Sequence, residues 1–167
     1  MSPTEERAIR TTWRNAPTNS VDVGGTTFVY RQLGPDTGVP VIFLNHLAAE
    51  LDRWDPRVVD GIAARRRVIV FDNRGIGASD GRTPSSVEAM ARDAVAFIRA
   101  LGAGQVDLLG FSLGGFISQV IAQEESSLGR VVDAPGGAWA VEKLGDDLAK
   151  AAWPLFQQIE AQGGLVK

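Results

Sequence analysis

Cysteine is absent from this chain of 167 residues, so disulfides, a thiolate nucleophile and cysteine-ligated metal sites are excluded. No apolar run approaches the roughly 18 residues that a membrane-spanning helix needs. Residues 1–14 are polar and charged, and they contain no apolar signal-peptide core. We therefore expect no membrane partner and a cytoplasmic location.

Histidine is nearly absent, and acidic residues outnumber basic ones. The only histidine is His46, and the net charge is −3. The basic run at 65–67 is too short to form a nucleic-acid-binding stripe, so no nucleic acid partner is expected. The glycine-rich stretch 110–115 matches neither Gly-x-Gly-x-x-Gly nor a Walker motif, which argues against nucleotide binding. We expect no cofactor and no metal site.

Strands alternate with helices along the first three-quarters of the chain. This order predicts an α/β fold with a mainly parallel sheet flanked by helices. The apolar runs and turn signals predict strands at 21–23, 26–31, 39–44, 68–71 and 106–109. The helical periodicity predicts helices at 56–64, 86–101 and from 113 to about 123. Residues 1–20 show no sustained period and are expected to be a lead-in.

The segment that follows the strand at 106–109 carries the strongest chemical signal. Its pattern Gly-Phe-Ser-Leu-Gly, with a strand before it and a helix after it, indicates a nucleophile elbow with Ser112 at the apex. Gly110 and Gly114 leave room for the tight turn. The segments 45–47 and 72–74 also follow predicted strands, so all three should meet at one edge of the sheet.

Residues 21–123 resemble the amino-terminal half of α/β-hydrolase-fold proteins, especially bacterial hydrolases and cofactor-free haloperoxidase-like members. Three motifs carry the resemblance: Phe-Leu-Asn-His-Leu at 43–47, Asp-Asn-Arg-Gly-Ile-Gly-Ala-Ser at 72–79, and the elbow. The resemblance implies that Ser112 is the nucleophile and that the backbone N–H groups of Leu113 and Leu47 hold the oxyanion. It also implies a small-molecule ester or acyl substrate.

The oxyanion segment departs from the family, which has His-Gly where this chain has Asn45-His46. His46 therefore either acts as a base for Ser112, or it packs in the loop or faces the substrate. Asp72 and Arg74 are expected to brace loops through charge-assisted hydrogen bonds rather than to touch substrate.

The segment 124–164 resembles a late part of the substrate-binding barrel of the methylmalonyl-CoA mutase family. The chain therefore divides into the lead-in 1–20, a truncated hydrolase core 21–123 and a mutase-like tail 124–167, with the seam near 123–125. The tail predicts a strand at 130–133 and an amphipathic helix, which Pro154 should kink or split. Asp133 either mimics the catalytic acid or is a turn residue. The cobalamin-binding signature is absent.

Two main functions compete. In the first, the chain is an esterase-like or haloperoxidase-like serine hydrolase that is impaired, because the half with the acid and histidine is missing. In the second, it is a non-catalytic truncated or chimeric half-domain that associates with itself or a partner through an exposed sheet edge. Mutase-like isomerase activity is a third and weaker reading. Whether the chain is an enzyme is left open by the sequence.

Overall fold

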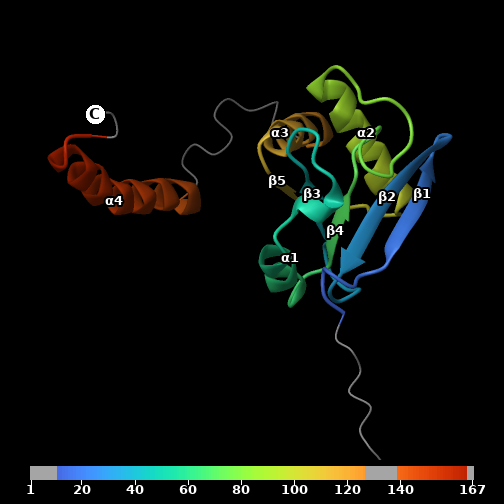
Figure 1. Cartoon of the computed structure of the whole chain (residues 1–167), viewed down its shortest axis with the longest axis horizontal. Coiled ribbons are helices and arrows are strands. Elements are labelled where there is room, and N and C mark those ends of the chain that lie inside the picture. The colour runs from blue at the N-terminus through green and yellow to red at the C-terminus, as the bar shows by residue number, and fades with distance from the viewer. Residues whose placement is uncertain (1–10, 127–138, 165–167) are drawn as a thin grey trace, which may run out of the picture. The chain divides into compact units, whose positions relative to one another are not determined.

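The computed structural model describes residues 11–126 and 139–164 of the chain (Figure 1). The chain forms two compact units, Met1–Ser126 and Ser127–Lys167. Among the described residues, no helix is long and apolar enough to cross a membrane.

The first unit is built on a five-stranded mixed sheet with the order β1-β2-β4-β3-β5. Strands β3, β4 and β5 are parallel, and β2 pairs antiparallel with both β1 and β4. The β1–β2 hairpin closes at Gly24 and Gly25, which both have positive φ as the expected turn requires. The strands are β1 (Thr18–Val23), β2 (Thr26–Leu33), β3 (Val41–Leu44), β4 (Val68–Phe71) and β5 (Asp107–Gly110).

Three helices flank this sheet in the described part of the first unit, and their ends follow the sequence signals. Helix α1 (Pro56–Ala63) is capped by Asp55, which accepts a hydrogen bond from the Arg57 N–H. Helix α2 (Val87–Ala100) is capped by Ser86, which accepts from the Ala89 N–H at 3.2 Å. Helix α3 (Leu113–Glu125) begins directly after Ser112. A short 3-10 helix, η1 (Leu51–Arg53), precedes α1.

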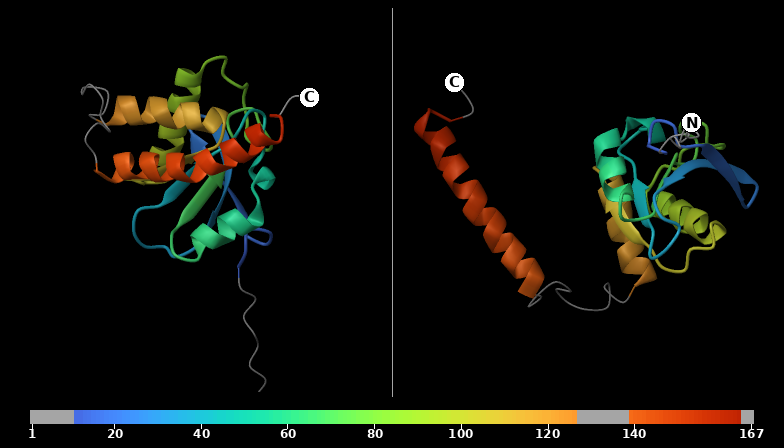
Figure 2. Two further views of the ribbon diagram at one scale, coloured as in Figure 1. Left: turned by 90° about the vertical axis from the view of Figure 1, so that its left-hand side faces the viewer. Right: turned by 90° about the horizontal axis from the view of Figure 1, so that it is seen from below.

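The core lies on both faces of the sheet because every side chain of β3 and β4 is buried. Alternate residues face opposite ways, as the two-residue period of a strand requires. One face packs against α1, and the other packs against α2 and α3 (Figures 1 and 2). The continuous apolar runs 41–44 and 68–71 are thereby explained, since strands covered on both faces carry no polar alternation.

The predicted α/β fold class is confirmed, with an antiparallel hairpin added to three parallel strands. The first strand begins at Thr18, three residues before the expected start. The segment before it also reaches the core, because Trp13 is only 2% exposed. The Trp13 N–H donates to the Asp60 carboxylate at 2.7 Å, and the Arg31 guanidinium lies 5.4 Å from the centre of the indole ring.

The second unit contains helix α4 (Trp139–Ala161). The helix continues through Pro154, so the prediction that this residue splits it is wrong. The surrounding residues are mostly alanine, leucine, glutamine and charged residues, which favour helix strongly enough to tolerate the one lost hydrogen bond. Ion pairs at i,i+4 spacing join Lys143 to Asp147 and Lys150 to Asp146. The predicted strand at 130–133, with Asp133, lies outside the described residues.

Candidate active site

The carboxyl ends of β3, β4 and β5 meet at one edge of the sheet. In the register of the parallel pair, Leu44 of β3 is opposite Gly110 of β5. One step further, the Phe111 N–H donates to the Leu44 carbonyl at 3.1 Å, which ties the two strand ends together. The segments that the sequence placed here, 45–47, 72–74 and Ser112, therefore leave the sheet as neighbours.

The backbone of Ser112 has the strained geometry of an elbow. Its φ is 55° and its ψ is −117°, a combination that L residues rarely adopt. The turn is tight, because a Cβ on Gly110 would lie 2.3 Å from the Gly114 carbonyl oxygen. The Ser112 side chain is exposed. The predicted elbow conformation of the backbone is thus present, and it leaves Ser112 exposed to solvent.

The N-terminus of α3 lies directly beside the serine. The N–H groups of Gly114 and Gly115 donate to the carbonyls of Phe111 and Ser112 at 3.0 and 2.8 Å. Leu113 is the first residue of the helix, so its N–H has no carbonyl four residues earlier within the helix to bind. An N–H in this position, at the positive end of the helix, is suited to an anion.

The second expected donor, Leu47, belongs to a tight turn after β3. The Ala49 N–H donates to the His46 carbonyl at 3.2 Å, and Ala48 has a φ of 55°. The Leu47 side chain is 69% exposed. The structure thus places the Leu47 turn and the Leu113 N–H on the same edge of the sheet, while their oxyanion role stays a prediction.

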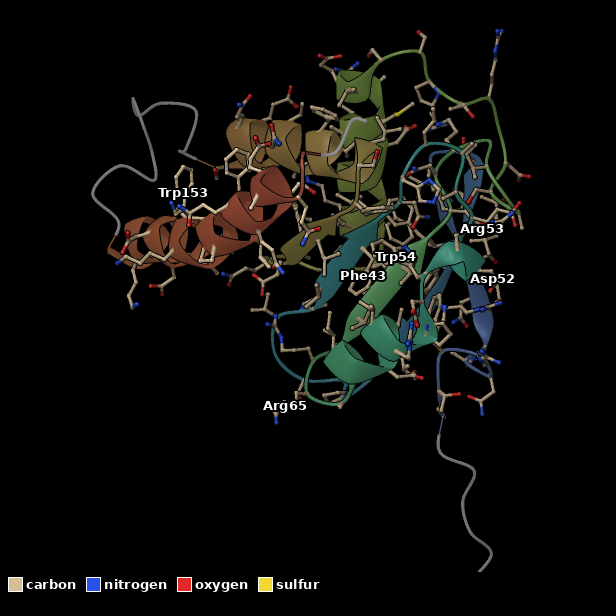
Figure 3. The ribbon with its side chains drawn as sticks, turned by 60° about the vertical axis from the view of Figure 1, so that its left-hand side comes forward. Phe43, Asp52, Arg53, Trp54, Arg65 and Trp153 are labelled. Atoms are coloured by element: carbon tan, nitrogen blue, oxygen red, sulfur yellow. The ribbon has the colours of Figure 1, made fainter. Side chains whose placement is uncertain are left out.

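Asn45 holds the Leu47 turn in place through hydrogen bonds of its buried side chain. It is 1% exposed, and its side-chain amide donates to the carbonyls of Ala49 and Phe71 at 3.2 and 2.9 Å. Its side-chain oxygen accepts a hydrogen bond from the Trp54 indole N–H. Figure 3 shows Trp54 beside Phe43, and their ring centres are 4.7 Å apart. Asn45 therefore links the turn to the end of β4 and to the core.

Trp54 is the residue of this region that sequence reasoning did not select. Its ring also lies 6.3 Å from that of Phe111, so it supports the residue immediately before the serine. No motif marks Trp54, because its role depends on the close approach of η1 to the ends of β3 and β5.

His46 is in the site but does not contact the serine hydroxyl directly. Its ring packs edge to face on Phe111, with 5.5 Å between ring centres and 89° between ring planes. Its Nδ1 lies 3.1 Å from the Leu47 carbonyl oxygen. Among residues 11–126 and 139–164, no hydrogen bond joins His46 to Ser112.

The loop after β4 is braced as predicted. Asp72 is buried and accepts hydrogen bonds from the N–H groups of Leu51 and Ala78 at 2.6 and 3.1 Å. Burial raises the pKa of the Asp72 carboxyl, while these two hydrogen bonds act in the opposite direction. Arg74 forms a two-pronged ion pair with Asp93, with both bonds at 2.7 Å. The bracing roles of Asp72 and Arg74 are therefore confirmed.

The described residues offer no obvious metal site, since no three histidine or acidic side chains among them gather closely enough to hold an ion. Asp133, which the sequence suggested as a mimic of the catalytic acid, lies outside the described part of the chain. The chemistry that this region can supply thus comes from one hydroxyl, one imidazole and the backbone N–H groups of two turns.

Comparison with known proteins agrees with this geometry. A family model described as alpha/beta hydrolase fold matches residues 39–134, which include all three motifs and more than half of the chain. The chain belongs to the α/β hydrolase fold family. The hydrolase resemblance expected from the motifs is confirmed, as is the mutase resemblance, because a methylmalonyl-CoA mutase model matches residues 116–167.

Individual relatives show the same division. An α/β hydrolase fold protein from Chitinophaga pinensis is 45% identical, with a TM-score of 0.68 over 69% of this chain and 42% of its own. A non-heme chloroperoxidase from Streptomyces lividans is 33% identical over 112 residues, covering 66% of this chain and 40% of the relative. A methylmalonyl-CoA mutase small subunit from Streptomyces virginiae is 51% identical over 49 residues, which are 29% of this chain and 8% of the relative.

The chain thus spans about two-fifths of the α/β hydrolase relatives and less than a tenth of the mutase relatives that it matches. The motif-bearing part of the hydrolase match lies within the described residues of the first unit.

Proposed function

We propose that this chain is a serine hydrolase of the esterase type, in which Ser112 attacks the carbonyl of a small-molecule ester or related acyl compound. The observation that supports this best is the backbone of Ser112, with φ at 55° and ψ at −117°. Strain of this kind persists only where the surrounding structure imposes it, and it is common at catalytic residues. Here it presents the hydroxyl to solvent at a helix N-terminus.

The negative charge that develops on the carbonyl oxygen would be stabilised by the Leu113 and Leu47 N–H groups. Both belong to turns at the same edge of the sheet, and the hydrogen bonds of Asn45 fix the Leu47 turn. Such fixed donors act without reorganising during the reaction. The exposed apolar side chains of Leu47 and Phe111 suit an uncharged acyl group.

Turnover by the chain is expected to be slow. In an efficient serine hydrolase, a base takes the proton of the serine through a direct hydrogen bond. Ser112 has no hydrogen bond to the imidazole of His46 within the described residues. The oxyanion donors and the binding surface alone still supply some rate enhancement over water.

A fluorophosphonate probe, which phosphonylates activated serines, tests this proposal. We expect covalent labelling of the full chain, and mass spectrometry of its peptides should place the label on Ser112. The variant Ser112→Ala should not label. Ser118→Ala serves as the matched control, because Ser118 lies in helix α3, which begins directly after Ser112, and its hydroxyl donates to the Gly114 carbonyl at 2.8 Å. Equal labelling of all three proteins would reject the proposal.

A second candidate function is association with another copy of the chain through β5. In the described part of the chain, β5 pairs only with β3. The residues of β5 are exposed or half-buried, whereas those of β3 and β4 are fully buried. Phe116 of the adjacent helix α3 is 61% exposed. An unpaired strand edge beside exposed apolar side chains favours pairing with a second sheet.

Size-exclusion chromatography with light scattering distinguishes this candidate from a monomeric hydrolase. Self-association should give a dimer mass that falls on dilution, and Phe116→Lys should shift the protein toward the monomer. A monomer at every concentration would rule out this second function without affecting the first.

A further inference from the structure

We infer that His46 is the base of Ser112, and that it receives the serine proton through one intervening water molecule rather than by direct contact. This inference rests on the proposed role of Ser112 as nucleophile. It adds a catalytic residue and a proton route to that site.

The contact of His46 with the Leu47 carbonyl favours one of its two neutral tautomers. A carbonyl oxygen can only accept, so in neutral His46 the contact of 3.1 Å with the Leu47 carbonyl is a hydrogen bond in the tautomer that carries its proton on Nδ1. Nε2 then carries the free lone pair. A serine-protease histidine is set in the same state by a carboxylate on Nδ1, and a backbone carbonyl takes that place here.

The strand register brings the backbones of His46 and Ser112 out of neighbouring strands. Leu44 and Gly110 are partners in the parallel pair, and His46 and Ser112 each follow two residues later. Neighbouring strands are about 4.8 Å apart, so the two residues leave the sheet at comparable positions. The His46 ring packs on Phe111, the residue directly before the serine. General-base catalysis needs the base within hydrogen-bond reach of the hydroxyl or one water away, and the proposal assigns the second of these arrangements to His46 and Ser112.

The proton balance of the step is complete. As Ser112 Oγ forms its bond to the acyl carbon, its proton passes to the water, and a proton of that water passes to His46 Nε2. When the ester C–O bond then breaks, the imidazolium returns a proton through water to the departing alcohol oxygen. No oxidant, reductant or metal takes part.

Packing on Phe111 alone would also account for the position of His46. Two variants distinguish this packing role from the role of base. His46→Phe keeps an aromatic ring against Phe111 but removes the basic nitrogen. His46→Ala removes both and leaves space in which free imidazole can bind.

The test measures the rate of fluorophosphonate labelling, with folding checked by circular dichroism. We expect both variants to label at least about ten-fold more slowly than the wild type, since general-base catalysis contributes about 10²-fold or more when contact is direct. Added imidazole should restore labelling in His46→Ala but should give none in Ser112→Ala. If His46→Phe does not fold, the imidazole response of His46→Ala decides.

Wild-type labelling rates in both His46 variants would overturn the role of His46 and leave Ser112 as the nucleophile. A slow His46→Ala variant that imidazole does not accelerate would likewise overturn it and indicate a packing role. Loss of specific labelling in the wild type would reject the proposed function itself.

Discussion

A Cβ atom added to Gly114 would lie 1.9 Å from the carbonyl oxygen of Leu44. This close approach joins the start of α3 to the end of β3, and the same carbonyl accepts the N–H of Phe111. The position of Ser112 between Phe111 and Gly114 therefore depends on a contact that only glycine permits.

We predict that Gly114→Ala destabilises the first unit by about 1–3 kcal/mol or more, because the methyl group must displace backbone rather than a flexible side chain. It should also abolish labelling of Ser112, since α3 would move away from β3. Gly115→Ala is the matched control, because a Cβ there meets nothing closer than 3.9 Å. Urea unfolding measures the stability of both variants. Equal stability of the two variants would contradict the prediction.

Ser112→Gly should raise the free energy of unfolding by about 1 kcal/mol while removing all labelling. Glycine adopts positive φ without the steric strain that serine has at 55°, although its greater freedom in the unfolded chain offsets part of the gain. Ser112→Ala loses the hydroxyl but keeps the strain, so its stability should not rise in the same way. Thermal and urea unfolding of the three proteins compare these effects, and a glycine variant less stable than the alanine variant would show that the serine backbone is unstrained.

Asp72 should make the stability of the first unit depend on pH. Burial raises the pKa of its carboxyl in the folded state, so the unfolded chain loses this proton first as pH rises. The stability that Asp72 contributes by its protonation is complete below the unfolded pKa, and it is lost as pH rises through the folded pKa. The difference in unfolding free energy between wild type and Asp72→Asn should therefore decrease from about pH 3 upward. A difference that grows over this range would contradict the sign.

Pro154→Ala should strengthen helix α4. Proline at an interior position lacks the N–H that would donate to the Lys150 carbonyl, and it is about 3 kcal/mol less favourable than alanine there. Far-ultraviolet circular dichroism of the full chain should show more helix. Gly145→Ala gives a scale for the measurement, because its surroundings are open and its expected gain is only about 1 kcal/mol. If Pro154→Ala gains less than Gly145→Ala, the proline is not the weak point of the helix.

The sequence predicted the parts of the fold that depend on local patterns. The apolar runs of β3 and β4 reflect strands that are buried on both faces of the sheet. The apolar stripe of α2 reflects a helix that is buried on one side. The elbow could be predicted as well, because a strand, two glycines and a helix leave few conformations for Ser112. Resemblance to the family then suggested the oxyanion roles proposed for Leu47 and Leu113.

Features that depend on contacts between distant segments could not be predicted. Trp54 supports both Asn45 and Phe111, yet no period or motif distinguishes it. The contact of His46 with the Leu47 carbonyl depends on the turn in which Ala48 has a positive φ. An alanine in the sequence gives no sign of such a conformation. Pro154 shows the reverse case: a strong local rule predicted a kink or a split, and the helix continues through this residue.

The buried indole of Trp13 has a practical consequence for anyone preparing this protein. It belongs to the core cluster on one face of the sheet, although its segment precedes the first strand. Its backbone N–H donates to Asp60, and the Arg31 guanidinium stacks on its ring. A shortened version that starts at Thr18 would retain every strand and the whole elbow. It would, however, leave a cavity the size of a tryptophan side chain in the core that β2 and α1 share. Such trimming would yield an unstable protein whose inactivity says nothing about Ser112.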